Sequence, residues 1–314
     1  MEDSPEQRLL SLIIPVYNEQ DVLPQLLPLI AAALEDVPLR HEIIVVDDGS
    51  TDGSWGYLEG QASERDDLML VRLSRNFGKE AAIMAGLRHC GGDVAVVIDG
   101  DMQHPPQMLS EMTAIWLAGE ADIVHAVKSA DRNAPLPDRL TSHGFGRLFR
   151  RLTGYELRGS TDYKLLDRRV VDVLNELRDY NLFFRGTTLW LGFRHREVFF
   201  ELGNRRGGRS KWTAMSRLAL AISAITSFTA LPLHLVTALG VLLPVVLVLL
   251  AAPVLLAPQA SGFKLLIVLV LLLGGFLSGA LAVIAAYLSK IHDEVRDRPL
   301  FLVDRIVRPG PEDG

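Results

Sequence analysis

Short apolar runs alternate with amphipathic stretches through the first 130 residues. Five runs rich in aliphatic and β-branched residues are expected to be buried strands, at 10–16, 42–48, 68–73, 93–99 and 121–127. Helical spacing of apolar residues predicts helices between them, at about 22–34, 79–89 and 106–117. Strands that are apolar throughout and alternate with helices predict an α/β fold. Its sheet is mostly parallel and covered on both faces.

The carboxyl-terminal third is more apolar. The 46 residues between Arg217 and Lys264, and the 25 between Lys264 and Lys290, include no Asp, Glu, Lys or Arg. A membrane span needs about 20 apolar residues. We therefore predict an interfacial amphipathic helix at 212–229 and two transmembrane helices, at 231–256 and 265–288. A pair of buried core helices is the alternative, and it is disfavoured because such helices seldom run this long without charge.

Basic residues near the spans predict their orientation. The segment 205–217 holds five basic residues and no acid, the segment 290–308 holds five basic residues among four acids, and the loop between the spans holds only Lys264. We expect a multi-pass protein of the cytoplasmic membrane with both ends in the cytoplasm. Its parts would be a cytoplasmic domain at 1–211, the interfacial helix at 212–229, a transmembrane hairpin at 230–289 and a tail at 290–314.

Composition narrows the function classes. The chain has 314 residues, of which 49% are hydrophobic, and this content excludes a disordered protein. Its 32 basic and 38 acidic residues give a net charge of −6, which argues against a nucleic-acid binder. The single cysteine, Cys90, cannot form an internal disulfide. The acidic, polar amino terminus does not resemble a secretory signal.

The residues that follow the first two strands suggest the ligand. The first strand is followed by Tyr17-Asn18-Glu19 and not by the glycine fingerprint of dinucleotide-binding folds, which argues against a nicotinamide or flavin enzyme. The second strand ends in Asp47-Asp48. Carboxylates there suit the hydroxyl groups of a ribose or the ring NH groups of a base. Two aspartates before a Gly-Ser turn are equally typical of a plain turn.

The fourth strand ends in Asp99-Gly100-Asp101. The two carboxylates can converge on one point, where they repel each other unless a cation joins them. Oxygen ligands favour Mg²⁺ or Mn²⁺, with phosphate oxygens and water completing the shell. Such a metal would bridge a diphosphate and stabilise a leaving nucleotide diphosphate. Acid-Gly-acid turns are common, so this pattern alone also fits a turn without a ligand.

Seven ordered motifs together resemble family 2 glycosyltransferases. They are I-P-V-Y-N-E at 14–19, V-D-D-G-S-T-D at 46–52, N-F-G-K-E-A-A-I-M-A-G-L at 76–87, D-G-D-M-Q-H-P-P at 99–106, D-Y-K-L-L-D-R-R at 162–169, F-R-G at 184–186 and R-R-G-G-R-S-K-W at 205–212. The last three, with the two spans, resemble the polyprenyl-phosphate glycosyltransferases, which include bactoprenol glucosyltransferases and dolichyl-phosphate mannose synthases. The resemblance covers about residues 8–290.

This resemblance implies a Rossmann-like GT-A catalytic domain that transfers a sugar, with inversion, from a nucleotide-sugar to a membrane polyprenyl phosphate. It implies nucleotide-sugar contacts from Pro15, Tyr17, Glu19, Val46, Asp48, Asp99, Gly100 and Lys128. It implies Mg²⁺ or Mn²⁺ held by Asp99, Asp101 and Gln103. It implies acceptor-phosphate contacts from Arg139, Ser142, Arg205 and Lys211, with Asp101, Asp162, Arg205 and Lys211 as catalytic residues. The relatives also suggest a homo-oligomer, and no nucleic acid partner is expected.

Several alternatives stay open. Asp162 either orients the acceptor or acts as a base, or it is a buried aspartate paired with Lys164 or an arginine. Arg209 stands where relatives often have an acid. UDP-glucose is the first expected donor, with UDP-N-acetylhexosamine, GDP-mannose and a modified arabinose as alternatives. A processive polysaccharide synthase would carry a Q-x-x-R-W motif and more spans, and a non-enzymatic membrane scaffold or sugar-nucleotide sensor would not need intact carboxylates.

Overall fold

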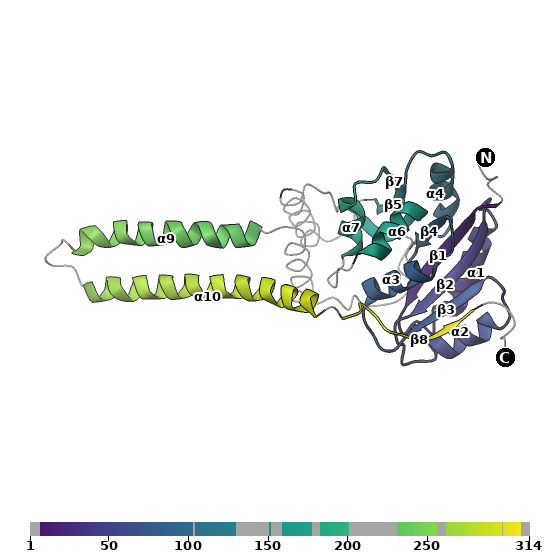
Figure 1. The fold of residues 1–314 in the computed structure, drawn as a ribbon, viewed down its shortest axis with the longest axis horizontal. Coiled ribbons are helices and arrows are strands. Elements are labelled where there is room, and N and C mark those ends of the chain that lie inside the picture. The colour runs from purple at the N-terminus through teal and green to yellow at the C-terminus, as the bar shows by residue number, and fades with distance from the viewer. Residues whose placement is uncertain are drawn as a thin grey trace. The chain divides into compact units, whose positions relative to one another are not determined.

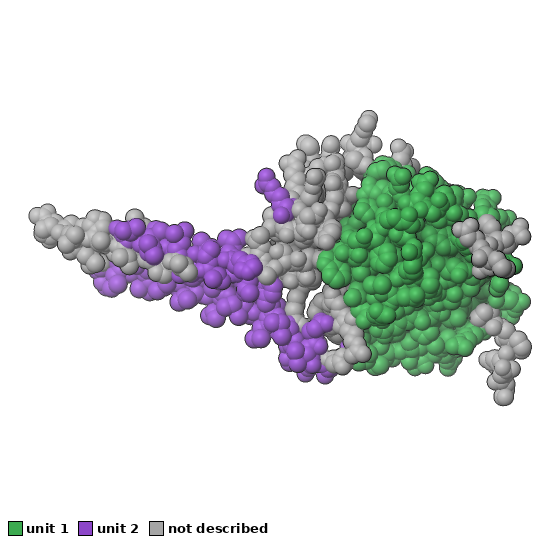
Figure 2. All heavy atoms as spheres, turned by 45° about the horizontal axis from the view of Figure 1, so that its top comes forward, with its two compact units in different colours: residues 1–150, 155–211, 299–314 green, residues 151–154, 212–298 purple. Residues whose placement is uncertain are grey.

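The computed structural model describes residues 7–102, 104–129, 151, 159–177, 183–200, 231–255, 262–296 and 298–308 (Figure 1). The chain divides into two compact units, one of residues 1–150, 155–211 and 299–314 and the other of residues 151–154 and 212–298 (Figure 2). Residues 299–314 belong to the first unit, although we expected them in a separate tail at 290–314. Gln103, Arg139, Ser142, Arg205, Arg209 and Lys211, and the predicted interfacial helix at 212–229, lie outside the described residues.

In the described part of the first unit, eight strands form one sheet in the order β7-β5-β6-β4-β1-β2-β3-β8. The strands are β1 (Leu9–Val16), β2 (Arg40–Asp47), β3 (Leu68–Leu73), β4 (Val94–Val97), β5 (Ile123–Lys128), β6 (Ser160–Asp167), β7 (His195–Phe200) and β8 (Val303–Val307). The pairs β1–β2, β1–β4, β2–β3 and β5–β7 are parallel. Strand β6 runs antiparallel to β4 and β5, and β8 runs antiparallel to β3. The mostly parallel α/β sheet is therefore confirmed.

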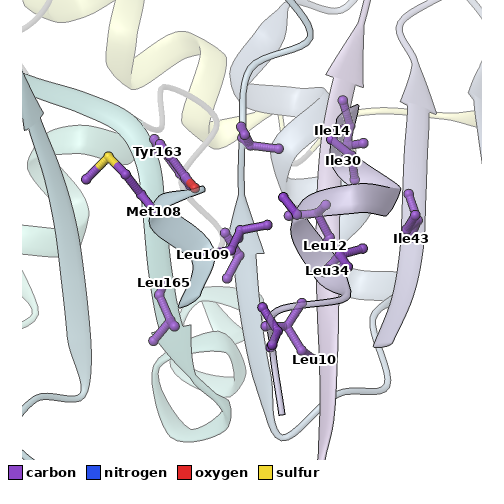
Figure 3. Packing of buried hydrophobic residues seen from close by; sticks show 14 of the residues in the cluster. Leu10, Leu12, Ile14, Ile30, Leu34, Ile43, Met108, Leu109, Tyr163 and Leu165 are labelled. Carbon is purple, nitrogen blue, oxygen red and sulfur yellow. The ribbon is translucent and has the colours of Figure 1, made fainter. Parts of the chain in front are cut away.

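Helices cover both faces of the sheet. They are α1 (Leu23–Leu34), α2 (Ser54–Ala62), α3 (Lys79–His89), α4 (Met108–Leu117), α6 (Arg168–Glu176) and α7 (Phe184–Trp190). One core cluster joins the sheet to α1, α2 and α4, and the other joins it to α3, α6 and α7. Alternate side chains of β1 enter opposite clusters, because Leu12 packs in the first and Ile13 in the second. Figure 3 shows Leu10, Leu12 and Ile14 of β1 beside Ile30 and Leu34 of α1.

In its described residues, the second unit consists mainly of two long apolar helices, α9 (Leu231–Leu255) and α10 (Gly262–Val295). Among the described residues, one 18-residue window, Leu272–Ser289, is long and apolar enough to cross a membrane, and none of that window is buried. It overlaps the second predicted span, at 265–288. Helix α9 covers the first predicted span, but no window of it passes the same test in the described residues. The predicted two-span, multi-pass arrangement is therefore not confirmed.

Candidate functional site

A cavity of about 280 Å³ lies at the carboxyl ends of β1, β2 and β4. It is lined by Pro15, Val16, Tyr17, Glu19, Asp48, Asn76, Gly78, Lys79, Ala82, Asp99, Gly100 and Asp101. This edge is where ligands bind in open α/β sheets. Six of the eight residues expected to contact a nucleotide-sugar line the cavity. The other two lie elsewhere, since the Val46 side chain is buried in the core and Lys128 ends β5.

Hydrogen bonds join the loops after β1 and β2. The Asn18 backbone N–H donates to Ser50 Oγ at 2.9 Å, and the Thr51 N–H donates to Asn18 Oδ1 at 2.8 Å. The Glu19 N–H donates to Ser54 Oγ at 3.0 Å. The motifs at 14–19 and 46–52 are therefore hydrogen-bonded to each other. Their contacts hold the first loop so that Tyr17 and Glu19 line the cavity.

The two aspartates after β2 have different roles. Asp47 Oδ1 accepts the Ser50 N–H at 3.1 Å, so Asp47 is a turn former. Asp48 accepts the backbone N–H groups of Phe77 at 2.7 Å and Gly78 at 2.9 Å, and burial raises its pKa. Gly78 adopts a φ of 98°, which favours glycine. Asp48 thus fixes the loop that leads into α3, where the third motif begins.

The cavity is rich in negative charge. Its described lining holds four carboxylates, from Glu19, Asp48, Asp99 and Asp101, and one ammonium group, from Lys79. A diphosphate would be repelled by this lining unless a divalent cation lay between them. In the described residues, no group of three or more His, Cys, Asp or Glu side chains could hold a metal ion. Two carboxylates suit Mg²⁺ nevertheless, because that ion is usually held by one or two carboxylates, substrate phosphates and water.

Lys79 joins this cavity to a second carboxylate beneath it. Its Nζ lies 2.5 Å from Asp99 Oδ1 and also contacts Asp162 Oδ2. Burial alone would lower the pKa of Lys79, but the charges of Asp99 and Asp162 outweigh burial and raise it. The side chain is therefore an ammonium ion shared between two acids.

Asp162 is paired with an arginine, as one of the sequence alternatives proposed. Arg185 Nε donates to Asp162 Oδ1 at 2.6 Å, and Arg185 Nη2 donates to Oδ2 at 2.8 Å. Lys164 is not its partner, because Lys164 Nζ donates to Thr188 Oγ1 at 2.6 Å. Burial alone would raise the pKa of Asp162, but hydrogen bonds from Arg185 and the charge of Lys79 lower it below its ordinary value. Asp162 is therefore a fully ionised, fully paired carboxylate.

Three residues at this site were missed by the sequence analysis. Lys79 and Arg185 lie inside motifs that it quoted, at 76–87 and 184–186, but it gave them no role. The third is buried His104, whose Nδ1 lies 3.7 Å from Asp99 Oδ2 and whose pKa is lowered by burial. Their membership of the motifs was the one available signal, since the contacts of Lys79 and Arg185 with Asp162 span 83 and 23 positions.

Residues 11–174 match the family model "Glycosyl transferase family 2". An uncharacterized glycosyltransferase of Synechocystis is 33% identical over 94% of both chains. A prophage-derived bactoprenol glucosyl transferase of Shigella flexneri is 30% identical over 96% of this chain and 99% of its own. An undecaprenyl-phosphate 4-deoxy-4-formamido-L-arabinose transferase of Pseudomonas fluorescens is 33% identical over 96% of this chain and 90% of its own.

A solved structure supports the fold assignment. The mannosyl-3-phosphoglycerate synthase of Rubrobacter xylanophilus superposes with a TM-score of 0.51, at 20% identity, over 70% of this chain and 73% of its own. At that identity the likeness concerns the fold alone, and it agrees with the GT-A type of sheet expected from the motifs.

Proposed function

Because the chain belongs to glycosyl transferase family 2, we propose that it transfers a sugar from a nucleotide-sugar donor to the phosphate of a membrane polyprenol. The observation that carries the proposal is the acidic cavity at the strand ends, where Asp99 and Asp101 lie beside Asp48. The relatives named for bactoprenol and undecaprenyl phosphate support the acceptor class. UDP-glucose is the first donor to test, because the glucosyl relative aligns over nearly its whole length.

The residues of the cavity fit a divalent metal. Asp99 and Asp101 would hold Mg²⁺ or Mn²⁺, and such an ion stabilises the charge of a leaving nucleotide diphosphate. The remaining task of the protein is to bind and orient two anions, the nucleotide-sugar and the polyprenyl phosphate. A phosphate monoester is already largely ionised near neutral pH, so the acceptor needs little help from a base. Asp162, fully paired with Arg185 and Lys79, fits a positioning role better than a proton-accepting one.

The path of the chain supports a membrane hairpin. Strand β7 precedes α9 and β8 follows α10, yet both strands belong to one sheet. A chain that crosses a membrane once must cross it again to return to that sheet. If α10 spans the membrane, α9 is the other long apolar helix among the described residues and would be the second span. The catalytic domain and the tail would then share one side, which basic flanking residues predict to be the cytoplasm.

A transfer assay tests the proposal. Full-length protein in detergent would be incubated with undecaprenyl phosphate, Mg²⁺ or Mn²⁺, and labelled UDP-glucose, UDP-N-acetylglucosamine or GDP-mannose. We expect butanol-extractable labelled lipid with one of the donors. We expect no labelled lipid when undecaprenol is supplied in place of undecaprenyl phosphate. A long labelled polymer would indicate a processive synthase instead. Donor binding without transfer to any acceptor would indicate a non-enzymatic sensor.

A further inference from the structure

One carboxylate, that of Asp162, contacts two cations, of which Lys79 lines the cavity. Lys79 Nζ and Arg185 Nη2 both contact the same oxygen, Oδ2 of Asp162. The two nitrogens therefore lie close enough to bind two oxygens of a single phosphate group. Lys79 also lines the cavity, so one of the two cations lies next to the carboxylates of the cavity wall.

The cations lie on the open side of this cluster. The side chain of Asp162 is 4% exposed, whereas those of Lys79 and Arg185 are 39% and 38% exposed. A guanidinium has five N–H donors. Arg185 uses Nε and one Nη2 hydrogen for Asp162, and among the described residues Nη1 has no hydrogen-bond partner. The edge formed by Nη1 and Nη2 is thus available for a second anion.

Two ionisable side chains, half-buried Glu80 and fully buried Lys164, hold the helix that carries Arg185. Glu80 accepts the Phe184 N–H at 3.0 Å at the start of α7. Lys164, which is fully buried, donates to Thr188 Oγ1 at 2.6 Å and to the Arg185 carbonyl oxygen at 3.4 Å. Burying such groups is unfavourable unless they are hydrogen-bonded. Here their bonds fix the position of one short helix and, with it, the position of one guanidinium.

We propose that Arg185, together with Lys79, binds a phosphate group of one of the two substrates. Arginine suits this task because its planar group can bind one anion along each of two edges. This inference rests on the proposed function, which supplies two phosphate sources, the donor diphosphate and the lipid phosphate. In it, Asp162 is a positioning residue that holds both cations toward the phosphate.

A matched pair elsewhere in the same chain provides the control. Arg194 also binds a buried aspartate in bidentate fashion, with Nε 3.0 Å from Asp122 Oδ2 and Nη2 2.9 Å from Oδ1. Neither residue lines the cavity. If the Arg185–Asp162 pair served stability alone, then neither Arg185→Lys nor Arg194→Lys would change the binding of a phosphate probe.

Direct binding to purified full-length protein tests the proposal without requiring turnover. The first probe is UDP with Mn²⁺, whose binding is measured by calorimetry. The second is undecaprenyl phosphate in nanodiscs, and undecaprenol in nanodiscs is its control without a phosphate. We expect Arg185→Lys to weaken the binding of one phosphate probe by roughly ten- to a hundredfold. Arg194→Lys should bind both phosphate probes like the wild type. Arg185→Lys should bind undecaprenol, which lacks the phosphate, like the wild type. Loss confined to UDP would place Arg185 on the donor side, and loss confined to the lipid phosphate would place it on the acceptor side.

Two results would overturn the inference. Wild-type affinity of Arg185→Lys for both probes would return the pair to a purely structural role and leave the proposed function intact. Failure of the wild-type protein to bind either probe would reject both ideas. Binding by the wild type without sugar transfer, combined with a loss in Arg185→Lys, would reject the proposed reaction and keep the phosphate site.

Discussion

Replacing Asp162 with asparagine removes the anion on which Lys79 and Arg185 converge. Asparagine keeps the size of the side chain, and its amide oxygen can still accept a hydrogen bond from Arg185 Nε. Its amide nitrogen would face the Lys79 ammonium and Arg185 Nη2, which are donors themselves. The variant therefore places a donor where two cations need an acceptor.

The loss of stability follows from those contacts. A hydrogen bond to a charged group contributes about 1.5–3 kcal/mol, so two lost bonds set a ceiling of about 3–6 kcal/mol. Lys79 and Arg185 are 39% and 38% exposed, and water therefore screens part of the loss. We expect about 2–3 kcal/mol, or a fall in Tm of roughly 5–10 °C. For Asp122→Asn we expect a smaller loss, because its partners Arg169 and Arg194 are 65% and 62% exposed and water screens their charges more strongly.

Thermal melts at several pH values complete the test. The pKa of Asp162 is lowered in the folded protein, so its contribution is fully present above the unfolded pKa. It is lost only as the pH falls through the lower folded pKa. The difference in Tm between wild type and Asp162→Asn should therefore be constant from about pH 5 to 8. Equal losses for Asp162→Asn and Asp122→Asn would refute the reasoning. So would an acid limb in the transfer rate near neutral pH that Asp162→Asn abolishes, since that limb would identify a base.

Three other substitutions test separate parts of the structure. Asp101→Asn should abolish transfer with Mg²⁺ or Mn²⁺ and leave Tm within a few degrees, because Asp101 is exposed; near wild-type turnover would contradict the metal assignment. Burial lowers the pKa of Lys164 to about 7, so the folded protein releases this proton before the unfolded chain does; melts should show wild-type stability rising from pH 7 to 10, and Lys164→Met should lack that rise. Phe301→Ala, in the segment before β8, should cost about 3–5 kcal/mol and expose the tail to limited proteolysis; an unchanged digestion pattern would show that Phe301 does not hold the tail.

The first five strands could be predicted because both of their faces are buried. Strand β1 is mostly aliphatic, as is the segment 43–46 of β2, and that pattern is visible in a single sequence. Strand β6 was missed because it carries Asp162 and Lys164, and a sequence analysis treats charged residues as exposed. Strand β8 was missed for a related reason, since three of its five residues are exposed and, within the described sheet, it lies at the edge and pairs with β3. Its assignment depends on a contact with a strand more than 200 residues away.

The candidate site divides in the same way. The carboxylates after β2 and β4 were identified because strand ends converge at one edge of a parallel sheet. The cations that complete the site were not identified, because Arg185 comes from a seven-residue helix that contains Gly186 and gives little periodic signal. Its contact with Asp162 spans 23 positions, and the contact of Lys79 with Asp162 spans 83. Motifs mark such residues, but only tertiary structure shows which of them form pairs.

Ionisable side chains such as Lys164, buried behind the cavity, contribute little stability for their volume. A buried ion pair often gives no more stability than well-packed apolar side chains of the same volume. Lys164 is fully buried and could be replaced by a methionine of similar length, yet its bonds are directed at Thr188 and at the Arg185 backbone. If Lys164→Met melts like the wild type at neutral pH but binds a phosphate probe more weakly, the amino group of Lys164 serves the position of α7 and not the stability of the core. In that case the departures from an apolar core in β6 mark the part of the fold that the chemistry requires.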